Sequence, residues 1–354
     1  LLGSEIFAAN VYGKLTDEKG EILSFASIYI KGTSIGTTSN LEGIYSLPLE
    51  PGTYELVFQY IGYDSKNEVV TIAKEDVKLN VVLAPIANNL EEVVVTLGED
   101  PAYRIIRKAI QKRKFYLEQV NEFSCDTYVK GRQHVRNLPK TFMGQSLEMF
   151  RQGLDSNGTG ILYLSESMSR LHQKNGEYKE IMSSSKVSGN DNGFSFNSGA
   201  ALAGINFYEN SFDLVGDTKI LSPIASTALG TYNYRLETSF FDNNKRLVYK
   251  IEVIPKNKLA AVFAGYIYIV DEDWAIHSTD LFTTGKSVNI SVLDTVHFKQ
   301  THINLGNDVW RLFTQEIGFK LRLLIIATEG EFVGVFSNYD LNPKFEPKFF
   351  DAEI

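Results

Sequence analysis

The stretch LEEVVVTLGEDPAYRIIRKAIQKRKFYLEQV, residues 90–120, decides how this chain is organised. Asp100 and Pro101 predict a helix start, because the Asp side chain can cap free N–H groups and the proline ring suits the first helical position. Apolar residues then recur every three or four positions along one face. Five basic residues line the other face, Arg104, Arg107, Lys108, Lys112 and Lys114, and the first four are the candidate binding residues. We therefore expect a strand at residues 92–96, a turn at Gly98 and one amphipathic helix that joins two β-rich domains.

Length and composition narrow the classes of protein. A chain of 354 residues can form two or three domains, each with its own core. The 23 Phe and 18 Tyr favour β-rich architecture over helical bundles. A formal net charge of −8 argues against a nucleic-acid partner, because binding to phosphates needs a basic footprint. The single cysteine, Cys125, excludes an internal disulfide and leaves the cellular compartment open.

The part of the chain before this stretch is predicted to be one small β-domain. Short β-patterned segments alternate with turn signals throughout residues 10–85, which is typical of a β-sandwich. Residues 1–9, ahead of it, have an apolar start and small residues at the end. They are read either as the remnant of a secretory signal peptide or as a frayed terminus.

A set of glycines and aromatic residues in residues 13–63 carries a family resemblance. Its members, with three apolar residues between them, are Gly13, Asp17, Gly20, Ala26, Ile28, Ile30, Gly32-Thr33, Gly36-Thr37-Thr38, Glu42-Gly43-Ile44-Tyr45, Gly52-Thr53-Tyr54 and Gly62-Tyr63. The pattern resembles the carboxypeptidase-regulatory-like domain, a transthyretin-like sandwich that is the N-terminal periplasmic module of many outer-membrane proteins of the Bacteroidota. Carboxypeptidase activity is not expected, because none of the five histidines begins an H-x-x-E or H-E-x-x-H zinc pattern.

The linker at residues 86–120 contains the candidate partner-binding residues. The run that includes Glu92, Val93, Val94 and Val95 resembles the segment that follows this module in TonB-dependent transporters. It is read either as an ordinary edge strand or as an exposed strand that a partner captures by β-augmentation. The basic helix face, with Arg104, Arg107, Lys108 and Lys112, is either a solvated surface or a surface for anionic lipid.

The run DPAYRIIRKAIQKRKFYLEQVNEFSCDTYVKGR, residues 100–132, carries a second resemblance. It is similar to the opening of a conserved domain in a Bacteroidota outer-membrane family of unknown function. Members of that family carry the regulatory-like module, then this domain, and usually a C-terminal β-barrel. The resemblance implies a periplasmic location at the outer membrane. It also implies a barrel beyond Ile354 if the chain is part of a longer protein.

Residues 121–354 are predicted to form a larger antiparallel β meander. From Thr231 onward, alternating segments are separated by hairpin-type turns, which favours a curved, half-barrel sheet. Residues 265–276 resemble the repeated unit of the lipoprotein-carrier half-barrel, in which a helix crosses the sheet. Residues 183–204, rich in Ser, Gly and Asn, are expected to be a long loop or lid.

Metal and catalytic sites are not expected. Residues 190–193 and 271–273 carry acidic or amide groups, but plain turns are the favoured interpretation. His297 and His302 are five apart and should face opposite sides of a strand. No catalytic constellation or cofactor motif is found.

The sequence thus favours a non-catalytic periplasmic interaction or assembly module whose partner is an outer-membrane β-barrel or another envelope protein. The alternative is a carrier or sensor of a lipid-like ligand held between the curved sheet and the helix. That alternative requires an apolar pocket of roughly several hundred Å3.

Overall fold

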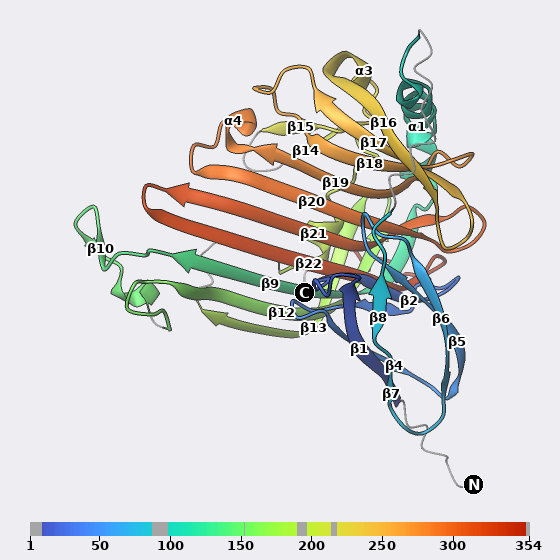
Figure 1. Cartoon of the computed structure of the whole chain (residues 1–354), viewed down its shortest axis with the longest axis horizontal. Coiled ribbons are helices and arrows are strands. Elements are labelled where there is room, and N and C mark those ends of the chain that lie inside the picture. The colour runs from blue at the N-terminus through green and yellow to red at the C-terminus, as the bar shows by residue number, and fades with distance from the viewer. Residues whose placement is uncertain (1–8, 87–97, 152, 190–196, 214–217, 352–354) are drawn as a thin grey trace.

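The computed structural model describes residues 9–86, 98–151, 153–189, 197–213 and 218–351. The chain is mainly β: an N-terminal β-sandwich, one long helix and a large antiparallel sheet with few other helices (Figure 1). The fold class expected from the sequence is confirmed. The candidate signal remnant and the residues Glu92, Val93, Val94 and Val95 lie outside the described residues, apart from Ala9, which opens the first strand.

Two four-stranded sheets form the sandwich. One contains β1 (Ala9–Asp17), β4 (Ile44–Leu49), β7 (Val77–Lys78) and β8 (Val81–Leu83). The other has the order β3 (Gly36–Thr38), β2 (Ser27–Ile30), β5 (Gly52–Gln59) and β6 (Lys66–Ile72). Buried and exposed residues alternate along β1 and β4, as expected of strands with one face on a core. Leu15, Tyr45 and Phe58 lie in that core.

Ten strands form the large sheet, and every pairing in it is antiparallel. In spatial order they are β13 (Glu177–Gly189), β12 (Gly160–Lys174), β9 (Glu122–Arg136), β22 (Ile326–Asp340), β21 (Trp310–Leu323), β20 (Leu293–Asn304), β19 (Ile276–Thr284), β18 (Ala264–Val270), β17 (Leu247–Pro255) and β16 (Tyr232–Phe241). The last strand, β22, therefore lies beside the first, β9. Between β9 and β12 the chain forms a small hairpin, β10 (Thr141–Phe142) and β11 (Gln145–Ser146), and the 3-10 turn η1 (Glu148–Arg151).

The long helix α1 (Pro101–Glu118) packs on one face of the large sheet. The Asp100 side chain accepts a hydrogen bond from the backbone N–H of Ala102, so the expected cap is present. Ile105, Ile106 and Ala109 are buried in the same core as the sheet. The amphipathic pattern thus places the helix where its apolar face is covered.

Further segments cover the same face beside α1. They are α2 (Gly199–Ala203), the hairpin of β14 (Ser211–Asp213) and β15 (Lys219–Leu221), and α3 (Ala228–Thr231). Phe207 and Phe212 from this region meet Phe263 and Phe298 of the large domain, with ring centroids 5.3 to 6.2 Å apart. Aromatic side chains thus cover the part of this sheet face that α1 does not reach.

The sandwich packs on the opposite face of the large sheet. Two neighbouring residues of β22 point to opposite faces of the sheet. Phe336 lies in the core with α1, and Val335 lies in a separate cluster with Tyr29 and Phe313. The rings of Tyr29 and Phe313 are 5.3 Å apart. Gly36 allows this approach, because a Cβ there would lie 2.7 Å from the Phe313 ring.

Two details differ from the sequence expectation. Residues 183–189 are not loop but the second half of β13, held by pairing with β12 despite their serine-rich composition. Pairing thus outweighs local propensity in β13. Between β19 and β20, where a hairpin-type turn was expected, the chain forms the short helix α4 (Gly285–Val288), capped by the Thr284 side chain.

Candidate functional site

The basic face of α1 is the candidate interaction surface that the structure describes. Arg104, Lys108 and Lys112 are exposed on it. Arg107 is exposed too but forms an ion pair with Glu99, with 2.5 Å between Nη2 and Oε1. The hydrogen bond to Glu99 raises the pKa of Arg107 and lowers that of the Glu99 carboxyl. Three of the four basic residues therefore carry no ion pair with a described residue.

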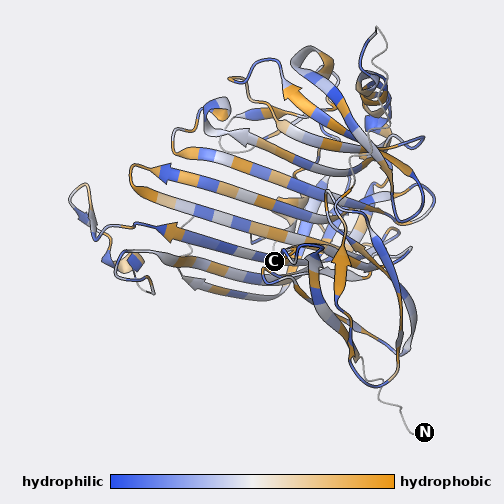
Figure 2. Cartoon of the chain, viewed as in Figure 1, coloured by the Kyte–Doolittle hydropathy of each residue, from blue (hydrophilic) through white to orange (hydrophobic). Residues whose placement is uncertain are grey.

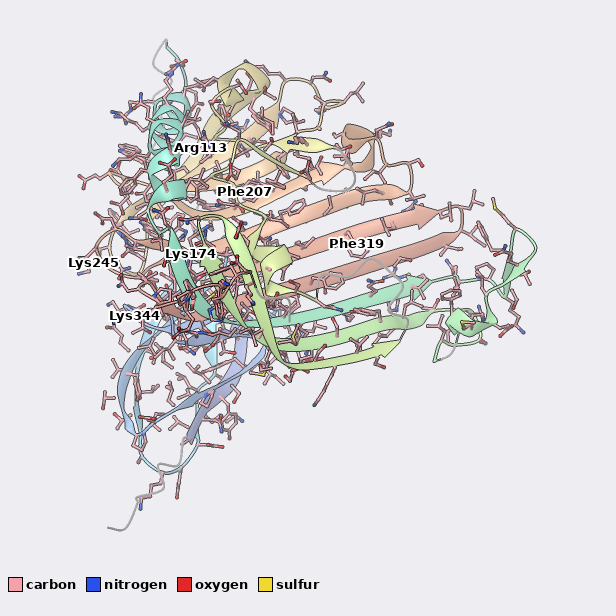
Figure 3. All side chains as sticks on the ribbon, turned by 180° about the vertical axis from the view of Figure 1, so that it is seen from behind. Arg113, Lys174, Phe207, Lys245, Phe319 and Lys344 are labelled. Atoms are coloured by element: carbon pink, nitrogen blue, oxygen red, sulfur yellow. The ribbon has the colours of Figure 1, made fainter. Side chains whose placement is uncertain are left out.

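Hydrogen bonds at several points along the helix fix the orientation of α1. Tyr116 Oη donates to the carbonyl oxygen of Asp273 at 2.8 Å, and Arg113 Nη1 donates to that of Tyr208 at 2.6 Å. Figure 3 shows Arg113 on the same side of the sheet as Phe207. Because these contacts anchor one side of the helix, Arg104, Lys108 and Lys112 are held toward solvent.

A small, partly polar cavity lies where the end of α1 meets the sheet. Its volume is about 70 Å3, and Tyr208, His302 and Tyr339 are among its lining residues. Burial lowers the pKa of His302 to about 3, so this imidazole is neutral at pH 7. Arg311, also in the lining, donates to the carbonyl oxygen of Val120 at 3.3 Å, and burial lowers its pKa. The cavity is far smaller than the pocket of several hundred Å3 expected for a lipid-like ligand.

A larger groove, of about 810 Å3, lies between the sandwich and the opposite face of the sheet. Ile35 of the sandwich and Met168 and Ile181 of the sheet line it with half-exposed apolar side chains. Asp126 and Arg170 also line it and form an ion pair at 2.7 Å. This groove was not predicted from the sequence, because its walls come from segments far apart in the chain, such as those that contain Ile35 and Met168.

The acidic turn at residues 271–273 has a structural role. The Asp273 carboxylate lies 3.2 Å from Arg246 and accepts a hydrogen bond from the Trp310 indole at 3.2 Å.

His297 stacks on Phe282, whereas His302 contacts Tyr208, so the two imidazoles do not meet. Within the described ranges, no three His, Cys, Asp or Glu side chains gather in a way that could hold a metal ion. Residues 190–193 lie outside the described residues.

Comparison with protein families gives two matches. The carboxypeptidase-regulatory-like domain matches residues 11–95, and the family of unknown function DUF5686 matches residues 105–339, about two thirds of the chain. This chain belongs to the DUF5686 family. Both resemblances inferred from the sequence are confirmed. In this DUF5686 protein the family region thus covers α1 from Ile105 onward and nearly all of the large sheet.

Curated relatives match the N-terminal part of the DUF5686 protein. TonB-dependent receptor P3 of Formosa agariphila is 36% identical over 98 residues, which are 27% of this chain and 10% of the receptor. TonB-dependent receptor P39 of the same organism is 34% identical over 87 residues, 25% of this chain and 8% of the receptor. The chain therefore spans a tenth or less of each of these relatives. The matched residues lie in the part of the chain that contains the carboxypeptidase-regulatory-like domain.

Solved structures give only remote matches. A DUF1329 family protein from Desulfovibrio piger is 12% identical with a TM-score of 0.25, over 71% of this chain and 97% of that one. A LolA superfamily protein from Nitrosomonas europaea is 10% identical with a TM-score of 0.23, over 69% of this chain and 96% of that one. Scores this low support no functional inference. Among the described helices, none is both long and apolar enough to cross a membrane.

Proposed function

We propose that this DUF5686 protein is a non-catalytic periplasmic module that binds an outer-membrane β-barrel or another envelope protein. The similarity of its N-terminal part to TonB-dependent receptors supports this envelope setting. Neither family description names an enzymatic activity. The sandwich, the large sheet and α1 supply fixed surfaces, which is what an assembly module requires.

The basic face of α1 is the binding surface in this proposal. The single observation that supports it best is the anchoring of α1 by Tyr116 and Arg113, which holds Arg104, Lys108 and Lys112 outward. A fixed row of cations on a chain of net charge −8 favours a partner with an acidic surface. Residues 92–95, which precede the helix, stay a predicted second contact, formed by strand pairing.

Site-specific cross-linking tests the proposal. A photoreactive amino acid is placed at Gln111, an exposed position beside Lys112, in a protein exported to the periplasm of a Bacteroidota host. We expect one dominant adduct with an outer-membrane β-barrel or envelope protein. The variant with Arg104→Glu, Lys108→Glu and Lys112→Glu should lose that adduct. Lys74→Glu, an exposed basic position on the sandwich, is the matched control and should keep it.

Other outcomes would count against this role. An adduct that survives the triple charge reversal would remove the basic face as the binding surface. A scatter of unrelated adducts would argue against a specific partner. The carrier alternative is the weaker proposal, because the cavity beside α1 has a volume of only about 70 Å3.

A further inference from the structure

The two ends of the large sheet carry turns of opposite chemistry. At one end the turns are polar: Asn175-Gly176, residues 242–245, residues 271–274 and residues 305–309. At the other end, Leu324-Ile325 joins β21 to β22. The β10–β11 hairpin, with Met143 in its turn, follows the end of β9 that pairs with Ala327, so it belongs to this same end. We call the second group the apolar turns, meaning Met143, Met149, Leu324 and Ile325.

The apolar turns are largely exposed to solvent. The side chains of Met143 and Met149 are 86% and 77% exposed, and those of Leu324 and Ile325 are 74% and 67% exposed. Figure 2 colours the β21–β22 turn as hydrophobic, and Figure 1 shows it with β10 along the edge of the molecule away from the sandwich. Large apolar groups so exposed mark contact sites or are a liability.

Backbone conformation makes these side chains harder to explain as ordinary turn residues. Met143 has φ +49° and Leu324 has φ +56°. Two-residue hairpin turns with positive φ favour Gly, Asn or Asp, because a Cβ is strained there. In the polar turns Gly176 and Asn307 follow that preference, whereas Lys245, Glu272 and Trp274 also have positive φ. Met143 and Leu324 differ from Lys245 and Glu272 in that the strained backbone presents an exposed apolar side chain, which gains no buried contact within the fold.

Charge follows the same division. The segments at the apolar end, residues 136–160, 285–294 and 320–329, hold six Lys or Arg and four Asp or Glu. The polar turns, residues 174–177, 241–246, 271–274 and 305–309, hold three basic and six acidic residues. The segments at the apolar end thus carry a net charge of +2 and the polar turns −3, within a chain of net charge −8. Two of the six cations at the apolar end, Arg136 and Arg322, form ion pairs with Glu329 and Asp294. Cations flanking apolar side chains suit an anionic lipid surface.

We propose that this end of the sheet docks on a lipid bilayer, with the apolar turns inserted between anionic head groups. Insertion at several separate tips suits a fluid bilayer, whereas a protein interface needs a continuous packed patch. Arg322 and Lys320, next to Leu324 in the chain, would then lie at head-group level. The inference goes beyond the protein-binding role of α1 and does not depend on it.

Flotation with protein-free vesicles of phosphatidylethanolamine and phosphatidylglycerol tests this inference. We expect the wild-type chain to float with the vesicles. The variant with Met143→Asn, Leu324→Gly and Ile325→Asn should partition at least about tenfold less, since three apolar side chains no longer enter the bilayer. Its melting temperature should stay equal or rise, because Gly and Asn suit positive φ.

A matched control uses apolar side chains that are equally exposed elsewhere. Val69→Thr on the sandwich and Phe241→Ser at the opposite end of the sheet should leave flotation unchanged. The inference is overturned if the wild-type chain stays unbound, or if the triple variant floats as well as wild type. It is also overturned if the triple variant changes only self-association in sedimentation, which would make the turns a contact between copies. None of these results bears on the cross-linking of α1.

Discussion

One oxygen of Asp100 links the start of α1 to the edge of the large sheet. Its Oδ1 atom lies 3.1 Å from the backbone nitrogen of Leu236 on β16 and 2.9 Å from that of Ala102. This oxygen therefore accepts a hydrogen bond from an N–H group of an edge strand and also caps the start of the helix. We expect Asp100→Ala to reduce the free energy of unfolding by about 1–3 kcal/mol, measured by urea denaturation.

Asp100→Asn is the control for this prediction, because its side-chain oxygen can still accept both hydrogen bonds. It should retain most of the stability. If Asp100→Ala were as stable as wild type, the double cap would not contribute to folding.

The Glu180 carboxylate fixes α2 to the edge strand β13. It accepts hydrogen bonds from Ser198 Oγ at 2.5 Å and from the backbone N–H groups of Gly199 and Ala200 at 2.9 and 3.0 Å. Burial raises its pKa, but these hydrogen bonds and one from Ser169 outweigh burial and lower it. Glu180→Ala should speed amide hydrogen exchange in α2 by roughly tenfold or more, corresponding to the loss of about 1–3 kcal/mol. Exchange in β17 should not change, and a uniform increase over the whole chain would contradict this local role.

Acid should destabilise the fold through His277. Burial lowers the pKa of this imidazole to about 4, from 6.5. Between these values the unfolded chain binds a proton that the folded chain does not, so the contribution of His277 is complete above pH 6.5 and is lost as pH falls to 4. In His277→Gln, the free energy of unfolding should fall less steeply with decreasing pH than in wild type. The two slopes should differ by about 1.4 kcal/mol per pH unit over this range. The free energy of unfolding is measured by urea denaturation at several pH values. The same dependence on pH in the two proteins would show that His277 is not buried as a neutral group.

The Phe313 ring joins the sandwich to the large sheet. It is fully buried and lies 5.3 Å from the Tyr29 ring, against Gly36. Phe313→Ala should cost about 3–5 kcal/mol of stability and increase proteolysis between the two domains. Phe313→Leu, which keeps most of the volume, should cost less. Unchanged proteolysis of Phe313→Ala would indicate that other contacts hold the domains together.

Cys125 should be inert in the folded protein. It is fully buried, and burial raises its pKa to about 12, so the reactive thiolate is scarce at pH 8. We expect no reaction with a thiol reagent under native conditions and complete reaction in denaturant. Ser184→Cys, at an exposed position on β13, provides a second thiol that should react at once. Rapid native labelling of wild type would contradict the burial of Cys125.

Sequence patterns predicted the parts of the fold that depend on near neighbours. The Asp100-Pro101 start of α1 and the meander from Tyr232 onward follow from capping and from period-two alternation, which are local rules. The domain boundaries inferred from composition stay predictions.

Other features depend on residues far apart in the sequence and could not be predicted. One is the hydrogen bond that the Leu236 N–H group donates to Asp100. Another is the groove lined by Ile35 and Met168. Both arise only when the chain is folded. Residues 183–189 were expected to be loop because Ser and Gly have low strand propensity, yet pairing with β12 orders them. Leu324 occupies a turn position where the rules expect Gly or Asn, so the residue type did not mark the turn.

The adjacency of β9 and β22 has a consequence for biosynthesis. It pairs Arg136 with Ala327 and Tyr128 with Val335, residues about 200 positions apart. A chain that emerges from its N-terminus first must therefore keep one side of β9 unpaired until almost the whole polypeptide has been delivered. During that interval the exposed strand can aggregate, so a newly made chain would benefit from a chaperone that shields β9.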